Sequence, residues 1–261
     1  MSVSKKPPIP SRRMLRVVRR NWLVWKKMAW TSIMTHVLEP AIALFGLGLG
    51  IGALIGEVEG GSYIVFVASA MAAYSSVNSA SFEGLYAAFT RMHVQRTWES
   101  ILCAPMQLDD VLLAEWLWAG CKAVMSSSAV LVMVVAFGYV DWRGALLSLP
   151  LCALVGLAMA ALALCVNALG RSYEFFSYFF SLFVTPMIML SGLFFPRSIM
   201  PEALQDATAW LPMTLAVQIL RPTATLSAQP ALLIAPAIGL AAYALLGVWL
   251  AAWLTRRRLL G

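Results

Sequence analysis

The chain has 261 residues, of which 61% are apolar and only 12% are charged. Soluble domains carry about 25% charged residues, so this composition excludes a soluble globular domain and indicates an integral membrane protein. The net charge is +7, and the positions of the basic residues, given below, relate that charge to membrane topology and not to nucleic acid. The four cysteines show no C-x-x-C spacing and predict neither a zinc site nor a disulfide framework.

The N-terminal segment divides into a tail and an amphipathic helix. Residues 1–10 are rich in lysine and proline, and we expect them to be disordered. In residues 11–30, apolar side chains recur at three- and four-residue steps, opposite a face of arginines and lysines. Tryptophans opposite cations suit a helix that lies in the membrane interface. We therefore predict an interfacial elbow helix, whose apolar face comprises Met14, Leu15, Val18, Trp22, Trp25 and Ala29.

Six apolar stretches follow, each about 20 residues long or longer, which is enough for a helix to cross a bilayer. They predict an all-α transmembrane domain over residues 31–261, with spans at 33–56, 63–82, 118–139, 145–169, 175–195 and 231–254. If both termini are cytoplasmic, all 19 lysines and arginines except Arg143, Arg197 and Arg221 lie on the cytoplasmic side. This orientation satisfies the positive-inside rule.

The polar segment 83–115 then lies in the cytoplasm. Within it, residues 95–105 can form a short amphipathic helix that ends before Pro105. Such a helix has little to pack against unless a partner supplies a groove, so we interpret it as a docking helix for a cytoplasmic protein. A helix lying on the membrane is the alternative. The candidate docking residues are Gln95, Arg96, Thr97, Trp98, Glu99, Ile101 and Leu102.

The segment after the fifth span predicts a gate on the outer side. Residues 198–221 form two short amphipathic pieces that prolines interrupt. Each is too short to cross the bilayer, and we interpret the pair as re-entrant or external gate helices. An ordinary external loop is the alternative. The gate residues are Pro196, Pro201, Trp210 and Pro212.

The second span is the most polar and the fifth the most aromatic, which makes both candidates for lining a transport path. Aromatic faces can stack on sugar rings or contact acyl chains, although rings can also fill helix contacts or face lipid, and polar side chains can simply bond between helices. The candidate path residues are Tyr74, Asn78, Phe175, Tyr178, Phe179 and Phe180.

Ionisable residues near the spans are few, and we expect all of them close to a cytoplasmic boundary. A carboxylate in mid-span, as ion-coupled transporters need, is therefore not predicted. These residues are Glu39, Glu83, Glu115, Lys122 and Glu174.

Catalysis finds little support in the sequence. The chain contains neither a P-loop nor an H-E-x-x-H motif, and we assign no catalytic residue. The alternative of a membrane-embedded enzyme that acts on lipid-linked sugars would require clustered carboxylates, for which Glu83 with Glu115 is the one arrangement to test.

Taken together, the chain resembles the membrane subunits of ABC exporters of the ABC-2 class. The resemblance covers nearly the whole chain and is carried by residues 96–105 (RTWESILCAP), 185–196 (TPMIMLSGLFFP), 211–212 (LP) and 221–222 (RP). Within the class, it is similar to nodulation-factor export permeases of the NodJ type, in residues 45–48 (FGLG), 86–89 (YAAF), 91–92 (RM), 95–99 (QRTWE) and 256–260 (RRRLL).

The resemblance implies a homodimer that binds two copies of a separate ABC ATPase of the NodI type. ATP and Mg²⁺ would bind to that partner, so that this chain would hold no cofactor or metal. The implied substrate is an amphiphilic glycolipid such as a lipo-chitooligosaccharide, moved outward across the bacterial inner membrane. Another lipid, a polysaccharide or a drug-like compound stays open as the substrate.

Overall fold

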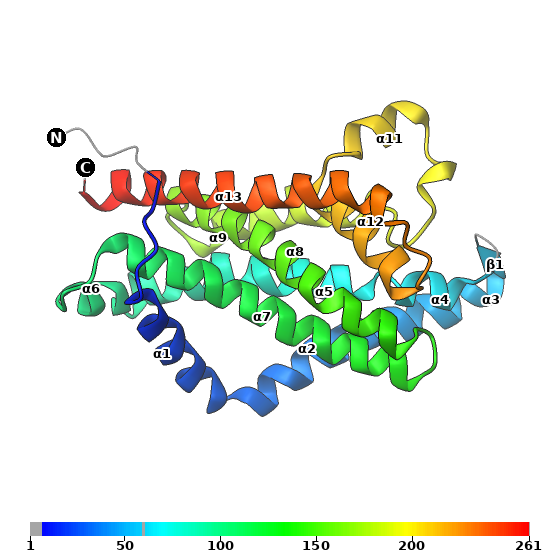
Figure 1. Ribbon diagram of the computed structural model, residues 1–261, viewed down its shortest axis with the longest axis horizontal. Coiled ribbons are helices and arrows are strands. Elements are labelled where there is room, and N and C mark those ends of the chain that lie inside the picture. Colours follow the sequence, from blue (N-terminus) through cyan, green and yellow to red (C-terminus); the bar gives the residue numbers. More distant parts are fainter. Residues whose placement is uncertain (1–6, 59–60, 261) are drawn as a thin grey trace.

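A bundle of long helices, roughly aligned with one axis, makes up the molecule (Figure 1). The computed structural model describes residues 7–58 and 61–260, with the side chains of residues 33, 35–37 and 260 excepted. Of the predicted tail, residues 7–10 have no regular structure, and residues 1–6 lie outside the described part. The two ends of the chain lie at the same end of the bundle, and α6 (Thr97–Leu102) lies there too (Figure 1).

The first half of the chain begins with the predicted elbow, which forms a helix somewhat shorter than the pattern suggested. A two-stranded antiparallel hairpin occupies the turn between the first two long helices, with Glu57 opposite Ser62. The elements are α1 (Met14–Lys26), α2 (Ala29–Gly50), α3 (Gly52–Ile55), β1 (Glu57–Val58), β2 (Gly61–Ser62), α4 (Tyr63–Ala68) and α5 (Met71–Phe82).

The second half contains the longest helices and three π-helical turns, η1, η2 and η3. The elements are η1 (Glu83–Ala87), η2 (Thr90–Val94), α6, α7 (Leu108–Ala136), α8 (Trp142–Leu169), α9 (Tyr173–Phe179), η3 (Phe180–Val184), α10 (Thr185–Met189), the 3₁₀ turn η4 (Arg197–Ile199), α11 (Glu202–Thr208), α12 (Pro212–Ala224) and α13 (Pro230–Leu260).

Within the described residues, five helices are long and apolar enough to cross a membrane. They are Leu38–Ile55, Tyr63–Val94, Leu108–Ala136, Trp142–Leu169 and Pro230–Leu259. The predicted fifth span, 175–195, is shorter than expected. α9, η3 and α10 follow one another as one continuous helix, which ends at Met189. A turn follows, in which Gly192 takes a φ of 85° that favours glycine.

The segment 83–115, which the sequence predicts to lie in the cytoplasm, is mostly helical and continuous with the two long helices on either side. The second long helix continues through η1 and η2 to Val94, and α7 begins at Leu108, ten residues earlier than expected. Asp110 caps the start of α7 by accepting from the backbone N–H of Gln107 at 3.0 Å. Only residues 95–107, which include α6, connect the two helices. The charges in this segment pair with one another, as shown below, and so do not end the helices.

Small residues let the long helices pack closely. A Cβ added to Gly84 would lie 2.7 Å from the Cβ of Ala163 on α8, and one added to Gly247 of α13 would lie 2.8 Å from the Cβ of Ala161. Close approach through glycine and alanine is how helices gain contact in a membrane, where burial of apolar surface gives little advantage. Helix α8 is therefore the centre of the bundle, with α5, α7, α12 and α13 packed around it.

The two predicted gate pieces behave differently. Helix α11 projects from the bundle at the end opposite the chain termini (Figure 1). Helix α12 instead packs against α8 and α13, and ten of its 13 residues are buried. Among the gate residues, Pro212 is buried, Pro196 is half-buried, and Pro201 and Trp210 are exposed. The second piece is thus part of the bundle and does not lie over its surface.

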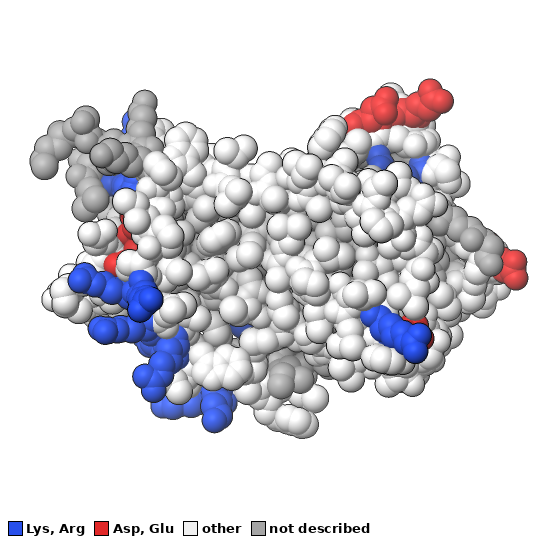
Figure 2. All heavy atoms as spheres, viewed as in Figure 1, with Lys and Arg blue, Asp and Glu red and all other residues white. Residues whose placement is uncertain are grey.

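Charged side chains lie mainly at the two ends of the bundle. Figure 2 shows lysines and arginines gathered over α1, near the end that carries the termini, and acidic side chains on α11, with a few further basic ones, at the other end. An almost wholly uncharged band lies between them. This distribution is typical of a protein whose middle faces lipid.

Candidate coupling face and transport path

The predicted docking helix is present but short. Arg96 adopts a left-handed conformation with φ 49°, which turns the chain out of η2, and α6 then spans only six residues instead of the predicted 95–105. Pro105 lies beyond its end, in the connection to α7.

The apolar face of α6 packs on its own chain, which sequence reasoning did not foresee. Trp98 is only 3% exposed and lies in a cluster with Met92, Leu112 and Ala251, while Ile101 and Leu102 are partly buried against that cluster. Among residues 95–102 the exposed side chains are polar: Gln95, Arg96, Glu99 and Ser100 are exposed and Thr97 is half-buried. The side chain of Trp98 is therefore an anchor that joins α6 to the ends of three long helices.

Further contacts fix the connection between α6 and α7. Arg13, just before α1, donates to the backbone carbonyl of Pro105, and Ser11 donates to the carboxylate of Asp110. Arg256, near the end of α13, forms an ion pair with Asp109, with Nε 2.8 Å from Oδ1. The docking helix is therefore tied both to the elbow and to the last helix.

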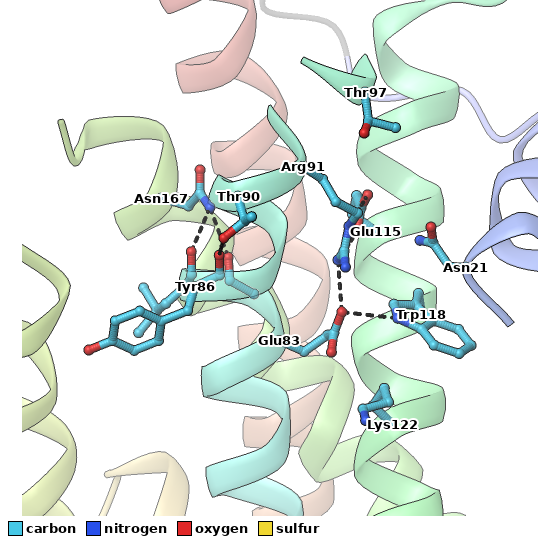
Figure 3. Close-up of polar contacts among 12 residues, drawn as sticks. Asn21, Glu83, Tyr86, Thr90, Arg91, Thr97, Glu115, Trp118, Lys122 and Asn167 are labelled. Carbon is cyan, nitrogen blue, oxygen red and sulfur yellow. Dashed lines mark hydrogen bonds and ion pairs between the residues drawn. The ribbon is translucent and has the colours of Figure 1, made fainter. Parts of the chain in front are cut away.

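A buried charge cluster lies deeper in the bundle (Figure 3). The guanidinium of Arg91 donates from Nε to Glu115 Oε1 at 2.9 Å and from Nη2 to Glu83 Oε1 at 2.8 Å. Trp118 Nε1 donates to the same oxygen of Glu83 at 3.0 Å. Glu83 and Glu115 do meet, as the enzyme alternative required, but Arg91 pairs with both of them. Carboxylates that share a buried cation are held in a structural ion-pair network, which does not favour a role as a free general acid or base.

The charge cluster joins helices that extend from α6. Arg91 belongs to η2, two turns before α6, whereas Glu115 and Trp118 belong to α7, which begins after it. On α1, Arg20 is close enough to interact electrostatically with Glu115, and burial lowers the pKa of that arginine. Movement of α6 would therefore pull on buried charges as well as on the Trp98 cluster.

Beside the charge cluster, the π-helical turn η1 is held by α8. Asn167 Nδ2 donates to the backbone carbonyls of Gly84 and Leu85, at 3.0 Å each, as Figure 3 shows. A π-turn misaligns the usual helical hydrogen bonds, and the amide of Asn167 satisfies two of the carbonyls. Nothing in the apolar pattern of residues 145–169 marked this residue.

Lys122 is also deeper than predicted. It lies half-way along α7, is buried, and donates from Nζ to Ser32 Oγ at 2.9 Å. Its ammonium lies 5.6 Å from the centroid of the Trp25 ring. The third span was expected to begin at residue 118, four residues before Lys122, but α7 begins at Leu108 and so places Lys122 half-way along the helix.

The candidate path residues form two groups. Tyr74 and Asn78 meet at Glu39: the hydroxyl of Tyr74 and Nδ2 of Asn78 donate to Glu39 Oε1 at 2.8 and 3.0 Å. Asn78 lies half-way along the 32-residue helix Tyr63–Val94, so Glu39 is level with the middle of that helix, while in its own helix Glu39 is the second residue of the candidate span Leu38–Ile55. The expectation that Glu39 lies close to a cytoplasmic boundary stays a prediction.

The aromatic candidates of α9 and η3 spread over different faces. The ring of Phe180 lies 4.7 Å from that of Phe82, beside the Glu39 pocket, whereas Phe179 stacks on Phe183 at 5.1 Å. Phe175 and Tyr178 are exposed. Phe179 and Phe183 border an apolar groove of about 710 Å³ along α13, which Trp210 also lines. Phe180 thus shares a surface with Tyr74 and Asn78, and Phe179 faces another.

In the part of the chain that the structure describes, no group of three His, Cys, Asp or Glu side chains lies together as a metal would require. The described side chains can instead form hydrogen bonds at Glu39, Tyr74 and Asn78 and stack a ring on Phe82 and Phe180. The exposed side chains of α6 are polar.

The chain is a bundle of long helices with an amphipathic first helix and a short helix anchored between its second and third long helices. Residues 12–224 match the family model described as ABC-2 type transporter, and the chain belongs to that family. No solved structure matches it.

Relatives within the family are nodulation proteins. The chain is 42% identical to nodulation protein J of Rhizobium meliloti (strain 1021) over 94% of its own length and 93% of that protein. It is 44% identical to nodulation protein J of Bradyrhizobium diazoefficiens over 79% of each chain, and 41% identical to that of Rhizobium leguminosarum bv. trifolii over 94% of this chain and 93% of that one.

Proposed function

We propose that this chain is the permease subunit of an ATP-driven exporter that moves an acylated oligosaccharide, such as a lipo-chitooligosaccharide, outward across the bacterial inner membrane. The observation that carries the proposal is the similarity to nodulation protein J over nearly the whole length. The fold supports it with a polar docking helix at one end of a membrane bundle.

The charge distribution supports an orientation with both termini in the cytoplasm. Lysines and arginines over α1 would then lie on the cytoplasmic side, as the positive-inside rule requires. α6 lies at the same end, within reach of a cytoplasmic ATPase, and α11 lies outside. In this proposal, residues 173–189 cross the membrane in addition to the five long helices and are the fifth crossing in chain order. A crossing is needed here because α8 ends and α13 begins at opposite ends of the bundle (Figure 1). At about 1.5 Å per residue they reach about 25 Å, and the turn at 190–196 completes the crossing.

Two copies of the chain, each bound to one ATPase subunit, would enclose the path. ATP binding would close the ATPase pair and push on Gln95, Arg96 and Glu99. Trp98 would pass that push to the ends of η2, α7 and α13, while Arg91 would carry it to Glu83 and Glu115. The chemical energy would reside in the partner.

The surface that carries Glu39, Phe82 and Phe180 is the proposed wall of the path. It combines hydrogen-bonding groups with exposed aromatic rings, which suits a molecule that has both sugar rings and an acyl chain. α11 and the segment around Pro196 and Pro201 would form the outer gate, and α12 would support it from within the bundle.

ATPase stimulation tests the proposal. The permease and its ABC ATPase subunit would be purified as a complex and placed in phosphatidylcholine nanodiscs, and ATP hydrolysis would be measured against the concentration of a lipo-chitotetraose. We expect a stable complex whose ATPase rate rises with the lipo-chitotetraose but not with chitotetraose that lacks the acyl chain. Failure of the two proteins to associate, or equal rates with both compounds, would contradict it.

A further inference from the structure

A small cavity opens between α2 and α5, about half-way along the bundle. It has a volume of about 200 Å³, the space of several water molecules. Its lining is polar on one side and aromatic at the rim: Glu39, Pro40, Tyr74, Ser75, Asn78, Ser79, Phe82 and Ser126.

The cavity carries an acidic group that has acceptor capacity left over. Tyr74 and Asn78 both donate to Oε1 of Glu39. A carboxylate offers about four acceptor positions on its two oxygens, so these two bonds use only half of them. Glu39 is exposed on the surface of the bundle, and where such a surface faces lipid a carboxylate is costly unless a partner or a ligand compensates for it.

Two further polar atoms of the cavity lining are buried without a hydrogen bond. Oδ1 of Asn78 and Oγ of Ser79 have no partner, and Ser79 is only 4% exposed. Buried polar atoms in native proteins are nearly always bonded. These unsatisfied groups line the same cavity as a carboxylate with spare acceptor positions. A few polar groups that converge on one cavity are typical of a binding site.

The chemistry of these groups selects the ligand. Glu39 and Asn78 supply acceptors, Ser79 can donate or accept, and the negative charge disfavours a phosphate or any other anion. Phe82 is half exposed at the rim, and its ring also contacts Phe180. A ligand with several hydroxyl or amide N–H donors and one apolar face fits this combination, and the volume admits about one ring.

We infer that the cavity lined by Glu39, Asn78, Ser79 and Phe82 is a subsite that binds one uncharged sugar ring of the exported amphiphile. This inference rests on the proposed function and adds to it a place in the path. The sugar's hydroxyl or N-acetyl N–H groups donate to Glu39 and Asn78, Ser79 completes its bonding, and the apolar face of the ring lies on Phe82.

Equilibrium binding tests the subsite. The complex of permease and ATPase, in phosphatidylcholine nanodiscs, is titrated with a radiolabelled lipo-chitotetraose. Because Glu39→Gln keeps the shape but removes the charge, we expect Kd to rise about tenfold, and Ser79→Ala to raise it about threefold. The control is Ser81→Ala on the same helix: Ser81 donates to the carbonyl of Val77 and does not line the cavity, so its Kd should equal that of the wild type.

The outcomes separate the subsite from the exporter. Wild-type binding that both Glu39→Gln and Ser79→Ala leave within twofold would overturn the subsite and leave the proposed function standing. No binding to the wild type would overturn both. Competition by phosphatidylglycerol as strong as that by unlabelled lipo-chitotetraose would overturn the sugar assignment. Should Glu39→Gln fail to assemble, Ser79→Ala against Ser81→Ala decides the question.

Discussion

Arg91 shows why single charged residues matter inside this bundle. Its guanidinium bonds both Glu83 and Glu115, and the side chain of Glu115 is almost fully buried. Buried charges are tolerated when they are paired and hydrogen-bonded. The planar fork of arginine reaches two carboxylates at once, which a single ammonium group cannot do as well.

Replacement of Arg91 should therefore destabilise the protein severely. Arg91→Met leaves two buried carboxylates without their cation, and we expect a loss of about 3–5 kcal/mol, seen as a lower thermal midpoint in detergent. Arg91→Lys should lose less. The matched control is Arg171→Met, since Arg171 is exposed and surface changes stay within about 0.5 kcal/mol. A midpoint for Arg91→Met equal to that of the wild type would show that the charge cluster contributes nothing.

At the scale of elements, α6 combines an anchor with a docking surface. Trp98 points into the chain and Glu99 points away from it. Periodicity predicted the apolar face correctly, but it could not say whether a partner or the chain itself covers that face. In the structure, the predicted docking residues fall into two groups: the apolar ones pack on the chain itself, and the polar ones are exposed or half-buried.

Two substitutions separate these roles. Trp98→Ala removes a buried ring at a cost of about 3–5 kcal/mol, so it should lower both the thermal midpoint and ATPase binding. Glu99→Lys reverses an exposed charge, so it should weaken ATPase binding about tenfold or more and leave the midpoint unchanged. Pull-down and thermal unfolding of the same preparations measure both. Equal ATPase binding by Glu99→Lys and the wild type would remove this residue from the docking surface.

The aromatic helix 173–189 allows a similar comparison within one element. Phe180 contacts Phe82 on the surface of the Glu39 cavity, and Phe179 stacks on Phe183 in the groove along α13. Since only the first surface is assigned to the path, Phe180→Ala should reduce export about tenfold, by analogy with the loss of about 1–3 kcal/mol per stacked ring. Phe179→Ala should reduce it less, with ATPase binding intact in both. Export assays in proteoliposomes would contradict the assignment if the two variants ranked in the opposite order.

At the scale of the whole molecule, the orientation can be tested with a natural residue. Cys103 is exposed just after α6, whereas Ser227 lies exposed between α12 and α13 at the other end. In a Cys121→Ser background, a membrane-impermeant maleimide should label Cys103 in inverted vesicles and not in intact cells. In a variant that also carries Cys103→Ser, Ser227→Cys should show the reverse. Labelling of Cys103 from outside intact cells would place α6 in the periplasm and defeat the proposal.

Hydropathy and charge were enough to predict a helical membrane protein, a helix near the N-terminus and a short helix between the second and third long helices. They failed to predict where charged residues pair inside the bundle. Glu83, Arg91 and Glu115 suggested that the helices end there because a sequence does not show that three charges will meet, and the early start of α7 places Lys122 further along that helix than expected. The burial of α12 was missed because a short amphipathic pattern does not reveal what packs against it.

ATP-driven transport in proteoliposomes tests the central claim most directly: a separate ATPase drives this chain through α6. Vesicles with the permease alone, with the permease and its ATPase, and with Glu99→Lys and the ATPase would be supplied with ATP and a labelled lipo-chitotetraose. The account predicts no transport by the permease alone, transport by the permease with its ATPase, and a rate at least about tenfold lower with Glu99→Lys and the ATPase. Equal ATP-dependent transport by the permease alone would contradict it.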